Sequence, residues 1–231
     1  EALQYTKCHR VIIEEFVTAL GNPLAGFAFA VDGKLAICSF SEEHCINSFN
    51  SIIPVVLTFP SSKSQYIQAK IIAEAQRLLE LLHIRTGAFV FEVRIDKEDN
   101  VYLMEVAPRH AGENRPLLTK MLMGTDTIEY TIKAALGEDC SELKQQPIDR
   151  YGSAYLVHSD RMGKLLSIDI DETYRKKNML EFTTGYKKGD AIYPFTGMDK
   201  TIGVMISHFD SYEEMMMKTY NFDKYVKVVL E

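Results

Sequence analysis

The stretch from Phe89 to Arg109 constrains the fold of this chain more than any other part of the sequence. Apolar and polar residues alternate from Phe89 to Ile95, and a second run with apolar residues extends from Val101 to Ala107. This period of two residues is typical of β-strands. The residues between the runs, 97–100, are all polar and predict a loop. We therefore expect an antiparallel hairpin.

The expected hairpin carries one glutamate on each strand. If Asp96 pairs with Val101, then Glu92 lies opposite Glu105 at about 5 Å, where like charges repel each other. Two such carboxylates favour a shared proton or a cation, so the pair is predicted to bind Mg2+ or Mn2+ together with phosphates. The simpler alternative is that Arg94, on the same face, neutralises both. In this register the other face is wholly apolar, formed by Phe91, Val93, Ile95, Tyr102, Met104 and Val106.

Composition excludes several classes of protein. The net charge of −6 and the dispersed basic residues argue against a nucleic-acid-binding surface. No apolar run is long enough to span a membrane, and the N-terminus does not resemble a signal peptide. The first residue is Glu1, which suggests an excised fragment or a processed protein. The cysteines lack metal-binding spacing and indicate reduced thiols in the cytoplasm, at Cys8, Cys38, Cys45 and Cys140.

The segments before the hairpin are predicted from similar patterns. Val11–Val17 is expected to form a strand, and Gly26–Val31 and Lys34–Phe40 are expected to form a hairpin around an Asp-Gly turn. The stretch Ser41–Pro60 is mostly polar, which predicts a long irregular loop that crosses a cleft. Apolar residues at helical spacing predict an amphipathic helix over Ser64–Ile84.

After the hairpin, helices are expected at Pro116–Met123 and Thr127–Leu136, each followed by a glycine. A polar stretch near residues 137–150 then predicts a domain boundary. The fold class is therefore α+β: an antiparallel sheet with helices over residues 1–143, followed by a small β-rich C-terminal domain over residues 148–231. That second domain is expected to contain strands at 151–158, 164–170, 191–193, 201–209 and 225–230, and a helix over 211–220.

The sequence Glu105-Val-Ala-Pro-Arg109 resembles a signature of the ATP-grasp superfamily. In that family two acidic residues lie on adjacent strands, and the second belongs to an E-x-N-x-R pattern. Ala107 replaces the family's asparagine, which removes one metal ligand. The resemblance covers most of residues 8–140, and the last eighty or so residues resemble the β-rich domain that follows ATP-grasp in carboxylases and purine-pathway ligases. Residues that end and begin helices also fit the family's order, at Pro116, Gly124 and Asp126.

By this resemblance, Val11–Val17 corresponds to the family's hinge strand, against which adenine lies. A backbone carbonyl of Glu14 or Glu15 would accept from the adenine amino group, and the backbone N–H of Val17 would donate. The acid that usually binds ribose is missing, and Asn22 would substitute for it. A core strand with two acidic residues is the alternative for this segment. The residues assigned to the nucleotide are Glu14, Glu15, Phe16, Val17 and Asn22.

Arg109 is the predicted catalytic residue. A guanidinium just beyond a metal-binding carboxylate can hold a phosphate, or a substrate carboxylate, with two hydrogen bonds. Its alternative role is a salt bridge to an acid such as Glu113. The loop His110–Arg115 is predicted to select the substrate, with a solvated loop as the alternative. Glu43 and His44, in the expected long loop, could approach the same cleft, although a surface histidine is the more typical reading of His44.

The resemblance implies an ATP- and Mg2+-dependent (or Mn2+-dependent) ligase that joins a small carboxylate to an amine through an acyl phosphate. The likeness is greatest to carbamoyl-phosphate-synthase-like ligases, and a homodimer is compatible with it. A non-catalytic nucleotide-binding or scaffold module is the alternative, favoured by Ala107 and the missing ribose acid; a biotin-carboxylase-like enzyme is a weaker third option. Because the family's glycine-rich phosphate loop is not found before Val11, the chain alone is expected to bind ATP at millimolar concentrations or weaker.

Overall fold

The structure is a computed structural model and describes residues 2–45 and 53–231. Its β-strands are β1 (Leu24–Val31), β2 (Lys34–His44), β3 (Val56–Phe59), β4 (Gly87–Ile95), β5 (Val101–Ala107), β6 (Tyr151–Val157), β7 (Gly163–Ile170), β8 (Met179–Thr184), β9 (Ala191–Ile192), β10 (Gly203–Phe209) and β11 (Val226–Leu230). Its helices are α1 (Gln65–Leu81), α2 (Arg115–Met123), α3 (Thr127–Ala135), α4 (Glu172–Lys177) and α5 (Tyr212–Thr219), with 3-10 turns at Ala2–Gln4, Met198–Lys200 and Phe222–Lys224.

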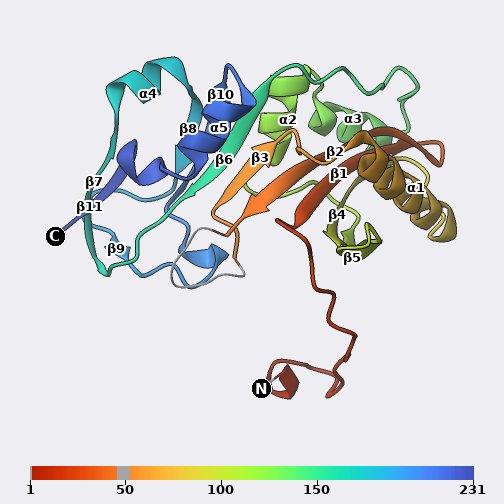
Figure 1. The fold of residues 1–231 in the computed structure, drawn as a ribbon, viewed down its shortest axis with the longest axis horizontal. Helices are drawn as coiled ribbons and strands as arrows, with labels where there is room; N and C mark the ends of the chain where they lie inside the picture. Colours follow the sequence, from red (N-terminus) through yellow and green to blue (C-terminus); the bar gives the residue numbers. More distant parts are fainter. Residues whose placement is uncertain (1, 46–52) are drawn as a thin grey trace.

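Eight of the strands form one sheet, in the order β5-β4-β1-β2-β3-β6-β10-β8 (Figure 1). A second sheet contains β11, β7 and β9. Every pairing recorded between these strands is antiparallel. The large sheet crosses the predicted domain boundary without interruption, because β3 pairs with β6. The division of the chain into two domains at residues 143–148 stays a prediction.

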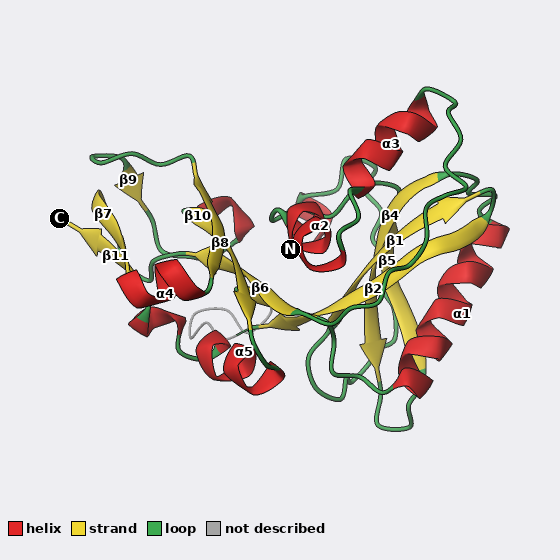
Figure 2. Cartoon of the chain, turned by 90° about the horizontal axis from the view of Figure 1, so that it is seen from above, coloured by secondary structure: helices red, strands yellow, loops and turns green. Residues whose placement is uncertain are grey.

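Helices cover both faces of the large sheet (Figure 2). On one face α1 packs its apolar side, including Ile71 and Leu79, against β1, β4 and the apolar residues of β5. On the other face α2 contributes Leu118 and Leu122 to a core with Phe27 of β1, and α3 lies beside it. The loop 108–114 joins β5 to α2 on this second face, where His110 stacks on Phe27 and Ala111 is part of the same core.

Local signals explain where several elements begin and turn. The hydroxyl of Ser64 accepts a hydrogen bond from the backbone of Ile67 and caps α1, and the carboxylate of Asp126 caps α3 in the same way. Asp32 and Gly33 both have positive φ, 50° and 82°, as a tight turn between β1 and β2 requires. Gly124, with φ of 71°, ends α2. These elements agree with the sequence-based predictions.

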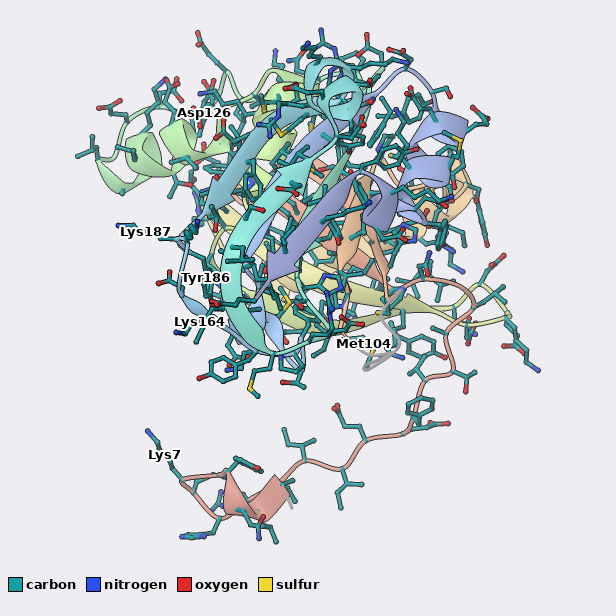
Figure 3. The ribbon with its side chains drawn as sticks, turned by 90° about the vertical axis from the view of Figure 1, so that its left-hand side faces the viewer. Lys7, Met104, Asp126, Lys164, Tyr186 and Lys187 are labelled. Atoms are coloured by element: carbon teal, nitrogen blue, oxygen red, sulfur yellow. The ribbon has the colours of Figure 1, made fainter. Side chains whose placement is uncertain are left out.

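The predicted strand at Val11–Val17 is wrong. Residues 10–19 have no regular secondary structure, and Ile12, Ile13 and Phe16 are more than 80% exposed. Figure 3 shows the chain just before this segment, marked by Lys7, apart from the rest of the molecule. Branched apolar residues favour a strand, but a strand also needs a neighbour to receive its hydrogen bonds, and no described strand pairs with this segment.

The predicted long loop at Ser41–Pro60 is also wrong in part. β2 continues as far as His44, and Val56–Phe59 forms β3, which joins β2 to β6. The centre of the expected loop lies outside the described residues. Polar residues can extend β2 because their side chains are bonded: the carboxylate of Glu42 accepts from both hydroxyls of Ser61 and Ser62. The helix α4 and the strand β8 were not predicted.

No helix in the described part of the chain is both long and apolar enough to cross a membrane.

Candidate active site

The β4–β5 hairpin brings two acids together. Glu92 of β4 pairs directly with Glu105 of β5, as predicted. Both side chains are exposed at the surface of the sheet that carries α2 and α3, and so are accessible to a ligand. Directly opposed residues of an antiparallel pair share one face, at about 5 Å. The hairpin therefore holds two carboxylates at a spacing that suits a shared cation.

The register nearer the loop differs from the prediction. Ile95, not Asp96, pairs with Val101, so the pairing near the loop is shifted by one residue from the prediction. An irregularity beside Glu92 inserts one extra residue in β5, as in a β-bulge. Beyond it the pairing follows the prediction, and Glu92 lies opposite Glu105. The predicted apolar face is wrong for two of its members, because Tyr102 and Met104 are 38% and 44% exposed. The residues of β5 that pack on the apolar face are Val101, Leu103 and Val106.

A small cavity lies beside the two acids. Its volume is about 40 Å³, enough for a single ion or water, and Glu92, Glu105, Arg109 and Arg115 line it. Ala25 of β1 forms part of the wall, because it pairs with Glu92 on the neighbouring strand. Within the described residues no three acidic, histidine or cysteine side chains are grouped closely enough to hold a metal. A metal held here would thus have two protein carboxylates and would need other ligands.

For Arg94 and Arg109, the simpler alternative was an ion pair with a nearby acid, and neither ion pair is found among the described residues. Among ion pairs of the described residues, none joins Arg94 to Glu92 or Glu105, so Arg94 does not pair with the two acids. No ion pair among the described residues joins Arg109 to Glu113, whose carboxylate pairs with Arg115. The Arg109 side chain is exposed, and its Nη1 donates to the carbonyl of His110 at 2.8 Å. Most of its donors therefore remain available to a ligand.

The loop before α2 holds Arg115 in place. Two consecutive residues, Glu113 and Asn114, both have φ of 53°, in the left-handed region that non-glycine residues rarely adopt. The Glu113 carboxylate accepts from Nε and Nη2 of Arg115 at 3.1 and 3.0 Å, and both side chains are about 80% buried. Backbone strain of this kind persists only where the surroundings hold it. Here the loop directs Arg115 into the cavity beside Glu92.

Glu43 is a further acid on the same face of the sheet. Ala25 pairs with Ser41 and with Glu92, and Glu43 lies two residues beyond Ser41 on β2. Burial, and then the negative charge of Glu92, raise the pKa of Glu43 to about 7, although Arg115 opposes the shift. The sequence pattern placed Glu43 in a loop, and only the strand register shows which face it occupies.

His44 is not the surface histidine suggested by the sequence. It is buried on the opposite face from Glu43, where its Nε2 lies 2.8 Å from the hydroxyl of Thr58. Its Nδ1 lies 3.1 Å from the amide nitrogen of Asn22 and 3.2 Å from the hydroxyl of Tyr220. Since an amide nitrogen only donates, Nδ1 is assigned as the acceptor. Burial lowers the pKa of His44, which agrees with this neutral form.

The N-terminal segment forms a larger cavity with the tip of the hairpin. The cavity has a volume of about 620 Å³, within the range of small-molecule sites. A backbone hydrogen bond from Leu20 to the carbonyl of Ile95, 2.7 Å long, joins the segment to β4. Of the residues predicted to bind the nucleotide, Glu15, Phe16 and Val17 line this cavity, whereas Glu14 and Asn22 are not part of its lining. The remaining walls come from residues 18–20, from residues 96–98 and from Tyr102.

Comparison with known proteins adds one partial relative. No family model matches the chain. An uncharacterised protein of Sinorhizobium fredii, y4rH, is 34% identical over 113 residues, which are 49% of this chain and 23% of that protein. The matched part is therefore too small a share of that relative to establish a function.

Solved structures resemble nearly the whole chain. The L-amino acid ligase from Bacillus licheniformis has a TM-score of 0.81 at 19% identity, over 94% of this chain and 53% of that one. Phosphoribosylglycinamide synthetase from Anaerococcus prevotii gives 0.80 at 18% identity, over 99% and 58%. The biotin carboxylase domain of 2-oxoglutarate carboxylase from Hydrogenobacter thermophilus, in complex with MgADP and bicarbonate, gives 0.69 at 14%, over 90% and 46%. The chain thus spans about half the length of these proteins, and the likeness confirms its predicted α+β fold.

Proposed function

We propose that this chain, whose ATP-grasp fold is that of the structures just compared, forms the metal- and phosphate-binding part of a ligase. The reaction would join a small carboxylate to an amine, with ATP and Mg2+, through an acyl phosphate. One observation carries the proposal: Glu92 and Glu105 are directly opposed, and Arg109 and Arg115 line the cavity beside them. Two acids and two guanidiniums at one site suit a metal with phosphates.

The two glutamates fit a divalent cation. Carboxylate oxygens are the ligands that Mg2+ and Mn2+ prefer, and Mg2+ commonly keeps waters or substrate phosphates as its other ligands. Ala107 offers no side-chain oxygen, so the remaining ligands would come from phosphate and water. Glu92 and Glu105 would hold such a metal, and its positive charge would offset the negative charge that develops on the phosphate during transfer. The hairpin contributes by fixing the two carboxylates on paired strands.

The guanidiniums have different parts in this proposal. Arg109 is exposed and could hold the transferring phosphate, or the acyl phosphate, with two parallel hydrogen bonds. Arg115 is already held by Glu113, so it would act as a fixed positive charge at the back of the site. Positioning and charge stabilisation supply most of the catalysis in phosphoryl transfer, and the protein needs to supply no covalent group.

The nucleotide would lie along the N-terminal segment. The cavity of about 620 Å³ between this segment and the hairpin supports the assignment of Glu15, Phe16 and Val17 to the adenine side. We retain Glu14 and Asn22 as proposed contacts of the adenine and the ribose. The Asn22 amide already donates to His44, so its carbonyl oxygen would be the group offered to a ribose hydroxyl.

Binding of Mn2+ in the presence of nucleotide tests the metal site directly. In the full-length protein, electron paramagnetic resonance should detect Mn2+ bound with ADP. The variant Glu92→Gln should weaken that binding at least about tenfold, since loss of a charged ligand removes 1.5–3 kcal/mol or more. Glu142→Gln, at an exposed position beyond α3 and outside both cavities, is the matched control. Unchanged Mn2+ binding in Glu92→Gln would show that the metal site is elsewhere.

A non-catalytic nucleotide-binding module is the second candidate. Ala107, in place of the family's asparagine, favours it, because the site then has one ligand fewer. The two candidates differ in turnover. A module without activity would bind Mn2+ and ADP through Glu92 and Glu105, yet release no ADP from ATP with any carboxylate and amine.

A further inference from the structure

The sheet carries one acid near the metal pair that the metal does not require. Glu43 lies on the same face as Glu92 and Glu105, but it is not grouped with them closely enough to form a metal site of three ligands. We propose that Glu43 binds the ammonium group of the amine-bearing substrate and so determines the choice of that substrate. This inference rests on the proposed function, because it names the chemical class that the same site selects.

Strand register fixes where Glu43 lies. A row of paired residues crosses four strands on this face: Glu105, Glu92, Ala25 and Ser41. Successive residues of a strand point to opposite faces, so Glu43 shares the face of Ser41 one repeat further along β2. Its backbone N–H donates to the carbonyl of Pro23 at 3.0 Å, which ties this end of β2 to the entry of β1. The acid is thus held on the sheet and not on a loop.

The charges around Glu43 leave a place for a cation. The acids that act on it are Glu92 and Glu113, and the cations are Arg94 and Arg115. Arg115, however, is bonded to Glu113 by both Nε and Nη2. No ion pair among the described residues joins Arg94 to Glu43. A cation that reached this face from solution would therefore meet a half-buried carboxylate with acidic neighbours.

An ammonium group suits this position better than a second metal. It carries a single charge and three donors, and one carboxylate with nearby carbonyl or hydroxyl groups can bind it. A divalent metal prefers several oxygen ligands at short range, and the described residues offer no group of three acidic, histidine or cysteine side chains here. Arg109, at the other side of the metal pair, is then free for the carboxylate or phosphate of the reacting partner.

Paired probes that differ in one group test the inference. We would measure binding to the full-length protein, with Mg2+ and ADP present, for L-alanine against L-lactate, L-leucine against 2-hydroxyisocaproate, and L-glutamate against 2-hydroxyglutarate. Each pair exchanges an ammonium for a hydroxyl and keeps the carboxylate. A hydrogen bond to a charged group contributes 1.5–3 kcal/mol, so the wild type should prefer one amino member about tenfold to hundredfold.

The variant Glu43→Gln should reduce that preference to less than about threefold, because the carboxylate charge is lost. Glu42→Gln is the matched control: it removes a carboxylate from the neighbouring position of β2, on the opposite face, and should keep the preference even if it lowers the melting temperature. A preference that persists in Glu43→Gln, or a wild type that prefers no amino member of any pair, overturns the inference.

Failure of the proposed function would look different. ATP turnover that survives Glu105→Gln would contradict the metal assignment while saying nothing against an ammonium site. Conversely, turnover that depends on Glu105, together with unchanged selectivity in Glu43→Gln, would keep the ligase proposal and reject the role of Glu43.

Discussion

Two glutamates of this molecule, Glu214 and Glu43, meet opposite surroundings. Glu214, on α5, accepts from Lys218 at 2.7 Å, from Lys177 at 3.1 Å and from the backbone of Asp210 at 3.0 Å. Burial alone would raise its pKa, but the hydrogen bonds from Lys218, Asp210 and Lys177 outweigh burial and lower the pKa to about 2. Its negative charge therefore stabilises the fold.

Among the described residues, Glu43 of β2 has no comparable set of hydrogen-bond donors. Burial and the charge of Glu92 raise its pKa to about 7, so its negative charge is unfavourable in the folded chain. The comparison shows that the charge of Glu214 is compensated within the fold. Around the β4–β5 hairpin, no ion pair among the described residues compensates Glu43, Glu92 or Glu105, which leaves these carboxylates available to a bound cation.

The largest effect should come from the metal pair. In the full-length protein, Glu105→Gln should lower ATP turnover at least about a hundredfold, since a metal contributes several kcal/mol to the transition state. The melting temperature should change little, because Glu105 is exposed and forms no ion pair with a described residue. ADP release and thermal unfolding on the same preparation check both parts. Near-normal turnover would show that the carboxylate of Glu105 is not needed for the reaction.

Arg109 should show the next largest effect. Replacement Arg109→Lys keeps the charge but loses the planar pair of donors, so turnover should stay about tenfold to hundredfold below the wild type. A structural arginine would behave otherwise: Arg109→Lys would then lower the melting temperature and leave turnover per folded molecule intact. Arg77→Lys, in an exposed ion pair on α1, is the matched control and should be silent in both assays.

Glu214→Gln should destabilise the protein without changing turnover per folded molecule. The expected loss at pH 7 is about 1–3 kcal/mol, because Lys177 and Lys218 lose their charged acceptor. A lowered pKa means that the stabilisation is complete above about pH 4.5 and disappears as the pH falls towards 2. Denaturant unfolding of variant and wild type should therefore converge at low pH. A constant difference over that range would show that charge is not the cause.

Glu43→Gln should change the stability in the opposite direction. Its raised pKa means that the folded chain binds more protons than the unfolded chain between pH 4.5 and 7, so stability falls as the pH rises through this window. Without metal or nucleotide, the variant should be more stable than the wild type at pH 8 and equal to it below pH 4.5. Thermal unfolding at the two pH values measures this. A variant less stable at pH 8 would mean that Glu43 is compensated inside the fold.

The sequence predicted the hairpin and its two acids because both depend on local alternation. The opposition of Glu92 and Glu105 was correct, although the pairing of Asp96 with Val101 was not. The alternation of residues does not reveal the extra residue in β5, because polar and apolar residues both occur at positions 101–105. The roles of Glu14, Glu15, Phe16, Val17 and Asn22 stay predictions.

Glu43 could not be placed from the sequence. Its neighbours Ser41, Glu42 and His44 are polar, and polarity indicated a loop. In the fold these residues are bonded by side chains from distant segments, such as Ser61 and Tyr220. Such long-range compensation has no local signal. The strand predicted before β1 was wrong for the converse reason. That segment has a local strand pattern, but no described strand pairs with it.

The extra residue in β5 has a consequence for recognising distant relatives. Apolar residues that face α1 occupy odd positions before it, Val101 and Leu103, and an even position after it, Val106. The chain thus marks the acid at position 105 by a change of phase in its alternation, independently of the residue at position 107. This phase change gives a criterion for searching for related sites that does not depend on the asparagine of the usual signature.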